Sequence, residues 1–277
     1  MAIAFNGSCE IYYESFGDPA DPTLLLVNGL GSQCINYHED WCALFVARGL
    51  RVVRFDNRDV GLSSKVDVAY TISDMAADAL AVLDAIGVER AHVMGLSMGG
   101  MIAQAMAIEH PERLLSMTSA MSRTGETGYG ESTPEALALL TAPPAVDRES
   151  YTAGSIAGLS VWGSPEHADE NRWRHTAERA FDRCFHPAGT ARQYRAVVGS
   201  PPRGERLREV TTPSLVIHGD CDTLIDISGG RRTAELIPGA RFEVIEGLGH
   251  DYPPQLWDRW VDLVCSFVVS DSQSASS

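Results

Sequence analysis

Lysine is almost absent from this sequence. Lys65 is the only lysine among 22 basic residues, which face 37 acidic residues and leave a formal net charge of −15. Binding to phosphate backbones or anionic lipid surfaces depends on clustered Lys and Arg, so this charge balance argues against both. We therefore expect no nucleic-acid partner and interpret the negative charge as favouring solubility.

Long apolar runs, paired cysteines and metal-ligand spacings are missing as well. No apolar run reaches the roughly 18 residues that a membrane span needs, and the N-terminus lacks the features of a signal peptide. The six cysteines form no C-x-x-C pair and have no histidine at zinc-ligand spacing. These absences predict a cytoplasmic protein with isolated, reduced thiols, no bound metal and no membrane insertion.

Alternating strand and helix patterns organise most of the chain. Of the 277 residues, 44% are hydrophobic and 21% are charged, which is enough apolar material for a sizeable core. Strands separated by helices imply right-handed crossovers and a parallel sheet. The expected strands are 10–17, 24–29, 51–56, 91–95, 113–120, 213–220 and 240–247. The expected helices are 38–49, 71–87, 99–110, 229–239 and 255–268.

The alternation is lost over residues 121–208, which are rich in Gly, Pro, Arg and aromatic residues. We interpret this segment as a helical lid inserted after the sixth strand, between a first core part, 1–120, and a second, 209–269. Its eleven basic and eleven acidic residues balance, so the whole net charge belongs to the rest of the chain. A neutral lid with apolar rings suits an uncharged, moderately hydrophobic substrate. The tail, 270–277, has low complexity and is predicted to be disordered.

A candidate nucleophile, Ser97, lies in the stretch VMGLSMGG, residues 93–100. A G-x-S-x-G match arises by chance in roughly one chain in ten of this length, so the context decides. Here it follows a predicted buried strand and opens a predicted helix, the setting that holds a serine on a strained turn. Gly95 and Gly99 would let strand and helix approach each other closely.

A serine nucleophile needs a base and an acid that orients the base, in the chain order Ser, acid, His. Among the eight histidines, His250 lies after the lid in a loop that follows a late strand, GLGHDYPP. His218 lies inside a strand run and is assigned a structural role. For the acid, Asp220, Asp222 and Asp226 all follow the strand that ends near His218, and spacing alone does not choose among them.

These residues, together with DNRDVGLS at 56–63, resemble the α/β-hydrolase family over nearly the whole chain. The resemblance implies an α/β fold with a mostly parallel central sheet flanked by helices. In that family the acid commonly lies four residues after the His of an H-G-x-x-D segment, which assigns it to Asp222 in HGDCD. The core stretches are similar to a branch of carboxylesterases and lipase-like hydrolases that includes the anthracycline methyl esterases; the similarity does not extend into the lid.

An oxyanion hole needs two backbone N–H groups aimed at the developing negative charge. One is expected from Met98, the residue after the nucleophile. By resemblance, the other is the N–H of Leu30 in NGLGS. Asn28 stands where the family has histidine, and we expect Asn28 and Trp162 to line the substrate pocket.

The acidic and basic side chains of the DNRDVGLS stretch, Asp56, Arg58 and Asp59, could be mistaken for an acid-base set. We interpret them instead as part of a buried salt bridge that holds the loop.

The sequence therefore predicts a serine hydrolase that cleaves a carboxylic ester of a small to medium, mainly uncharged molecule through an acyl-enzyme. This chemistry requires no metal and no organic cofactor. Two alternatives stay open: the same residues could serve carbon–carbon bond, lactone or perhydrolysis chemistry, or the chain could be a ligand receptor with the hydrolase fold. A homodimer is compatible with the sequence.

Overall fold

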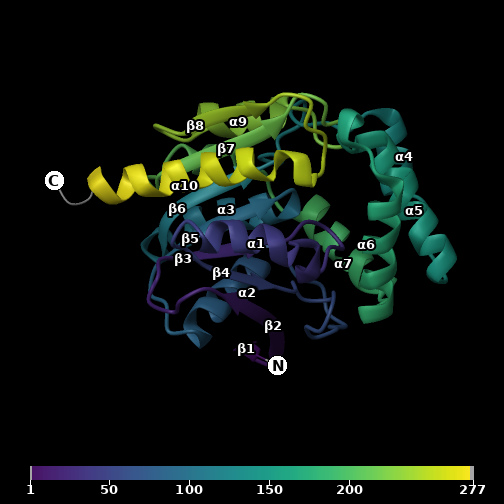
Figure 1. The fold of residues 1–277 in the computed structure, drawn as a ribbon, viewed down its shortest axis with the longest axis horizontal. Helices are drawn as coiled ribbons and strands as arrows, with labels where there is room; N and C mark the ends of the chain where they lie inside the picture. The colour runs from purple at the N-terminus through teal and green to yellow at the C-terminus, as the bar shows by residue number, and fades with distance from the viewer. Residues whose placement is uncertain (1, 275–277) are drawn as a thin grey trace.

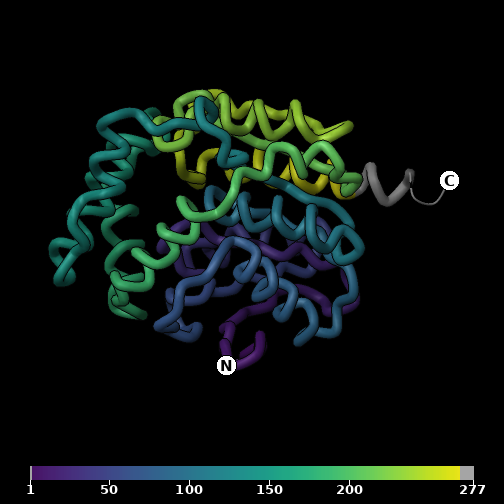
Figure 2. The backbone as a smooth tube through the Cα atoms, turned by 180° about the vertical axis from the view of Figure 1, so that it is seen from behind, coloured from purple at the N-terminus to yellow at the C-terminus, as the bar shows by residue number. Residues whose placement is uncertain are grey.

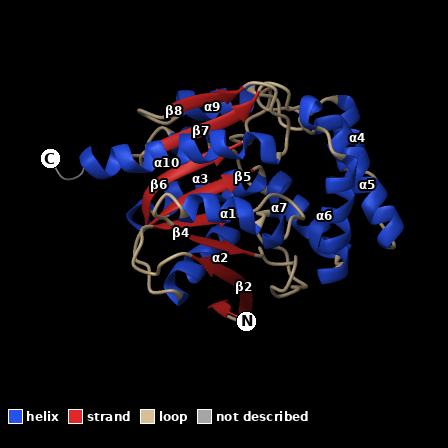
Figure 3. Cartoon of the chain, in the orientation of Figure 1, coloured by secondary structure: helices blue, strands red, loops and turns tan. Residues whose placement is uncertain are grey.

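A sheet of eight strands forms the centre of the computed structural model, which describes residues 2–274 (Figure 3). The strand order is β1-β2-β4-β3-β5-β6-β7-β8. β2 pairs antiparallel with both β1 and β4, and the remaining neighbours pair parallel. The strands are β1 (Ala2–Asn6), β2 (Cys9–Phe16), β3 (Thr23–Val27), β4 (Arg51–Phe55), β5 (Ala91–Leu96), β6 (Leu114–Ala120), β7 (Ser214–Gly219) and β8 (Arg241–Ile245). The predicted mostly parallel sheet is confirmed.

Helices cover both faces of this sheet, because its central strands are apolar on both sides. α1 and α10 pack on one face, where the rings of Trp41 and Trp260 meet edge to face, and α2, α3 and α9 pack on the other. The helices are α1 (Glu39–Val46), α2 (Ile72–Ala85), α3 (Met98–Glu109), α4 (Pro134–Leu140), α5 (Arg148–Trp162), α6 (Glu170–Arg183), α7 (Pro187–Gly199), α8 (Gly204–Leu207), α9 (Ser228–Leu236) and α10 (Trp257–Ser274). α2 begins with the predicted capping box of Thr71 and Asp74.

Helices α4 to α8 lie between β6 and β7, within the segment predicted as an insertion. We call residues 121–208 the inserted segment. α4, α5 and α6 stand together at one end of the sheet in both views, on the side away from the C-terminus (Figures 1 and 2). The rings of Tyr151, Phe181 and Phe185 pack on one another inside this segment. Its action as a lid stays a prediction.

Two ends of the fold differ from the prediction. β1, with the sequence AIAFN, forms the edge strand and was not predicted, because it is short and its Phe5 side chain is exposed. α10 runs to Ser274, so the predicted disordered tail begins inside this helix. The last three residues of that tail, 275–277, lie outside the described residues.

The charged side chains of the 56–63 loop are buried and paired, but with partners outside that loop. Arg183 of α6 lies 2.7 Å from Asp56 Oδ2, and Arg192 of α7 lies 2.8 Å from Asp59 Oδ2. Arg58 pairs instead with an aspartate of α2, Asp78. The buried salt bridging predicted for this loop is present, and two of the three side chains also fasten the inserted segment to the loop.

Candidate active site

Ser97 occupies a strained turn between β5 and α3. Its backbone has φ of 58° and ψ of −120°, in the left-handed region that side chains rarely adopt. The turn is held on both sides, because Ser97 N–H donates to Ala120 O (2.9 Å) and Ser122 Oγ donates to Ser97 O (2.8 Å). Ser97 is only partly buried, whereas its neighbours from Ala91 to Gly100 are fully buried. The fold thus presents this one side chain at the end of a buried strand, as predicted.

The glycines on either side of Ser97 are required because a side chain at these positions would clash with the backbone. A Cβ at Gly95 would lie 2.0 Å from Gly99 O, and a Cβ at Gly99 would lie 2.0 Å from Val27 O. Both obstacles are backbone atoms, which cannot rotate away. The close approach of strand and helix that the sequence predicted is therefore present.

We expect Gly99→Ala to destabilise the fold by about 3 kcal/mol, because β3 and α3 must separate to admit the methyl group. Gly154 is the matched control: it is an exposed glycine inside α5, and a Cβ there would meet nothing within 4 Å. Gly154→Ala should stabilise the protein by up to about 1 kcal/mol, since alanine favours a helix. Urea unfolding of the two variants measures the difference; equal stabilities would contradict the packing argument.

The loop after β3 lies against Ser97. A Cβ at Gly29 would be 3.3 Å from Ser97 Cβ and 3.8 Å from its Oγ. Among the hydrogen bonds of residues 2–274, Gly31 N–H donates to Gln193 Oε1 (2.8 Å), while the N–H of Leu30 has no acceptor. Met98 is the first residue of α3, so its N–H has no intrahelical acceptor. The secondary structure therefore uses the N–H group of neither predicted oxyanion-hole donor.

Asp222 and His250 are brought together from two loops. His250 Nδ1 lies 2.7 Å from Asp222 Oδ2. The other oxygen, Oδ1, accepts from the N–H groups of Leu224 and Ile225, both at 2.9 Å. Because a carboxylate can only accept, Nδ1 carries a proton, and in the neutral imidazole Nε2 is then the nitrogen that can act as a base.

The other two candidate acids are occupied elsewhere. Asp220 and Asp226 are exposed, and each accepts a backbone N–H of its own surroundings, from Gly247 (2.7 Å) and Ser228 (2.9 Å). Of the three aspartates, only Asp222 is hydrogen-bonded to His250 in the described part of the chain. The geometry therefore favours Asp222 among the three, and its role as the acid stays a prediction.

A second histidine, His218, contacts Asp222. This contact was not predicted from the sequence. His218 is fully buried in β7; its Nε2 donates to Ile225 O (2.8 Å) and lies 3.4 Å from Asp222 Oδ2. Burial alone would raise the pKa of Asp222, but the charge of His250 and hydrogen bonds from both histidines lower that pKa to about 2. The i, i+4 spacing of His218 and Asp222 was the available signal. The His218 side chain helps to keep the Asp222 carboxylate ionised.

Three further predictions concern Ser97, Asn28 and Trp162. Within the described part of the chain no hydrogen bond joins Ser97 Oγ to His250, so the complete triad stays a prediction. Asn28 is buried and its Nδ2 donates to Phe55 O (3.2 Å), which ties two loops together. Trp162 is partly buried, and its carbonyl oxygen, at 2.5 Å, accepts the N–H of His250. A substrate-lining role for either side chain stays a prediction.

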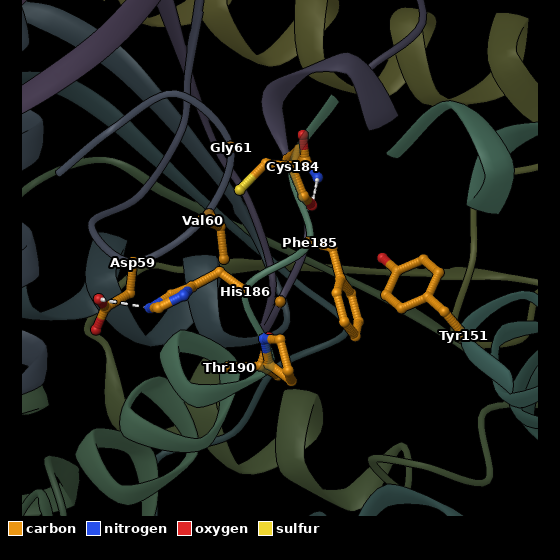
Figure 4. A pocket seen from close by; sticks show the side chains of 11 residues that line it. Asp59, Val60, Gly61, Tyr151, Cys184, Phe185, His186 and Thr190 are labelled. Carbon is orange, nitrogen blue, oxygen red and sulfur yellow. Dashed lines mark hydrogen bonds and ion pairs between the residues drawn. The ribbon is translucent and has the colours of Figure 1, made fainter. Parts of the chain in front are cut away.

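A pocket lies where the loops after β3 and β4 meet the inserted segment (Figure 4). Gly31, next to Leu30, borders it, and the rings of Tyr151 and Phe185 form an apolar wall. Asp59 also borders it, and Arg192 pairs with that carboxylate. The pocket thus combines aromatic surface with a neutralised charge.

The sequence also led to predictions about cysteines, metal-ligating clusters and membrane-spanning helices. All six cysteines are free, as expected. Within residues 2–274, no three His, Cys, Asp or Glu side chains gather as a metal site, and no helix has the length and apolar character to cross a bilayer.

Comparison with known proteins identifies the family. Residues 22–149 match the family model of the α/β-hydrolase fold. The chain is 32% identical to a rhodomycin D methylesterase, DnrP, from Streptomyces peucetius, over 94% of this chain and 95% of that protein. The chain belongs to the α/β-hydrolase family. The predicted resemblance to anthracycline methyl esterases is confirmed.

Other members of the α/β-hydrolase family resemble the chain more distantly. A 3-oxoadipate enol-lactonase from Acinetobacter baylyi is 27% identical over 91% of this chain and 89% of that protein. The crystal structure of an enol-lactonase from Burkholderia xenovorans superposes with a TM-score of 0.81 at 25% identity, over 96% of this chain and 99% of that one. These relatives support the predicted enzyme class, a hydrolase of carboxylic esters.

Proposed function

We propose that this α/β-hydrolase is a serine esterase that uses Ser97, His250 and Asp222. The observation that carries the proposal is the 2.7 Å hydrogen bond from His250 Nδ1 to the buried Asp222 carboxylate, in the same fold that strains Ser97. A serine on a strained turn, an oriented imidazole and an ionised acid are the parts that acyl transfer requires.

In the proposed reaction, Ser97 Oγ attacks the ester carbonyl carbon while His250 Nε2 takes the hydroxyl proton. The N–H groups of Leu30 and Met98 donate to the oxyanion of the tetrahedral intermediate. As the C–O bond breaks, His250 returns the proton to the leaving alcohol and an acyl-enzyme remains. Water, deprotonated by the same nitrogen, then attacks the acyl carbon, and the acid is released with the Ser97 proton restored.

The side chains that line the pocket of Figure 4, aromatic rings and paired charges, favour an uncharged group beside them. Burial lowers the pKa of His186 at its rim, so this side chain is neutral near pH 7. Asp59 is paired with Arg192, so no uncompensated charge faces the space. A relative is named a methylesterase, which makes an aromatic methyl ester the first class to test.

A panel of substrates tests the proposal. We expect hydrolysis of p-nitrophenyl acetate, p-nitrophenyl butyrate and methyl benzoates, with kcat/KM rising as the acyl part gains apolar surface. Turnover of none of these esters would contradict the esterase proposal.

Lactone hydrolysis is the second candidate, because two of the relatives reported above are named enol-lactonases. The same three side chains would open a cyclic ester, with the leaving alcohol staying attached to the acyl part. A lactone turned over orders of magnitude faster than every open-chain ester on the panel would favour this candidate.

A further inference from the structure

The C-terminal end of α5, in the inserted segment, contacts both loops that carry the acid and the base. The last carbonyl groups of a helix have no donor within the helix. Here Val161 O accepts from Thr223 Oγ1 (2.9 Å), next to the acid, and Trp162 O accepts from the N–H of His250 (2.5 Å). Two carbonyls at one helix end are therefore satisfied by the two catalytic loops.

Ser164 extends this contact to both neighbours of His250. It is fully buried, and its Oγ accepts from Gly249 N–H (2.9 Å) and donates to Asp251 Oδ1 (2.5 Å). Its own N–H also donates to Asp251 Oδ1 (3.0 Å). Three consecutive residues of the base loop, 249–251, are thus hydrogen-bonded to the turn 162–164.

The two turns pack without free space. A Cβ at Gly249 would lie 2.3 Å from Gly163 C and 2.4 Å from Trp162 O. Since the imidazole is fixed at Nδ1 by Asp222 and at its backbone by this turn, a shift of the turn changes the direction in which Nε2 points.

We propose that Ser164 and Asp251 are positioning residues, through which the inserted segment sets the orientation of the His250 imidazole. This inference rests on the proposed function of His250 as the base. Neither residue is hydrogen-bonded to Ser97 in the described structure, so both act through the base loop. The end of α5 is then a part of the catalytic apparatus, and not only of a substrate lid.

Ser164→Ala removes the acceptor of Gly249 N–H and one donor to Asp251. We expect kcat on p-nitrophenyl butyrate to fall about 10- to 100-fold, because a small displacement of a catalytic group is enough for such a loss, while KM stays within about twofold. Ser160 is the matched control: it is an exposed serine of the same helix whose Oγ, within residues 2–274, bonds only to Ile156 O. Ser160→Ala should leave kcat unchanged.

The two oxygens of Asp251 allow a second comparison. Asp251→Asn keeps an acceptor oxygen for Ser164, whereas Asp251→Ala removes it. We expect the asparagine variant to retain most of the wild-type kcat and the alanine variant to lose as much as Ser164→Ala. If Ser164→Ala does not fold, the comparison of Asp251→Asn with Asp251→Ala tests the proposal. Equal kcat values for these two variants would overturn it.

Two readouts separate positioning from general damage. The first is the rate at which diethyl p-nitrophenyl phosphate phosphorylates Ser97. This rate is measured as the release of the leaving group, p-nitrophenolate. The second is the downfield proton NMR signal of His250 Nδ1–H, which depends on its hydrogen bond to Asp222. In Ser164→Ala we expect slower phosphorylation and a shifted or broadened signal, with both unchanged in Ser160→Ala.

Failure of this inference and failure of the proposed function give different results. If the wild type releases no p-nitrophenolate above the Ser97→Ala background, the proposed function is wrong, and the NMR comparison alone decides the positioning role. If the wild type is phosphorylated and Ser164→Ala reacts at the same rate with the same NMR signal, the positioning role is overturned.

Discussion

Ser97→Ala is expected to lower kcat on p-nitrophenyl butyrate about 10⁶-fold, close to the background rate. Without the hydroxyl no acyl-enzyme forms, and His250 has no proton to accept. The oxyanion donors Leu30 and Met98 stay in place because they are backbone groups. KM should therefore change far less than kcat.

The Ser97→Ala variant is a clean test because its fold should be unaffected. Ser97 Oγ forms no hydrogen bond within residues 2–274, and alanine meets the same backbone strain at φ of 58° as serine does. We expect its free energy of unfolding to lie within about 0.5 kcal/mol of the wild type. Equal rates of ester hydrolysis for wild type and variant would contradict the assignment of the nucleophile and the esterase proposal together.

The architecture could be predicted from hydrophobic patterning because its central strands are buried on both faces. Continuous apolar runs such as 24–29 are distinctive, and the helices between them force parallel crossovers. β1 lacked this signal, since an edge strand with an exposed Phe5 carries no apolar run. The strand order β2-β4-β3-β5 depends on which edges pair in three dimensions, and periodicity along the chain carries no information on that pairing.

The candidate site could be predicted where a local motif describes it. Ser97 sits in a strand-turn-helix context, and His250 follows a late strand in a glycine-rich loop. Contacts between distant segments could not be predicted: Arg183 pairs with Asp56 more than a hundred residues away, and Ser164 bonds to Asp251, 87 residues away. Such pairs depend on where the inserted segment folds back, and its irregular sequence does not indicate this.

The second large effect on kcat is expected from replacing the proposed catalytic acid, Asp222. Asp222→Asn is expected to lower kcat about 10⁴-fold. Asp222 Oδ1 is already held by the N–H groups of Leu224 and Ile225, so the asparagine oxygen takes that position. Its Nδ2 then faces His250 and donates to Nδ1. The imidazole proton is forced onto Nε2, which can no longer accept the proton of Ser97.

Asp220→Asn and Asp226→Asn are the matched controls for Asp222→Asn. Both side chains are exposed and each uses an oxygen to accept a backbone N–H, which asparagine can do equally well. We expect kcat within about twofold of the wild type for both. All three variants remove one negative charge from the same loop, so a general electrostatic effect would lower the three rates alike.

The pKa of Asp222, lowered to about 2, makes this comparison valid over the working pH range. The wild-type carboxylate is ionised from about pH 4 upward, so its protonation does not contribute to any loss of kcat between about pH 5 and 9. Measured across this range, the deficit of Asp222→Asn therefore reports the missing acceptor. Nearly full kcat in Asp222→Asn, with a loss of orders of magnitude in Asp220→Asn or Asp226→Asn, would make the assignment of the acid wrong, because the tautomer of His250 would then be set by another group.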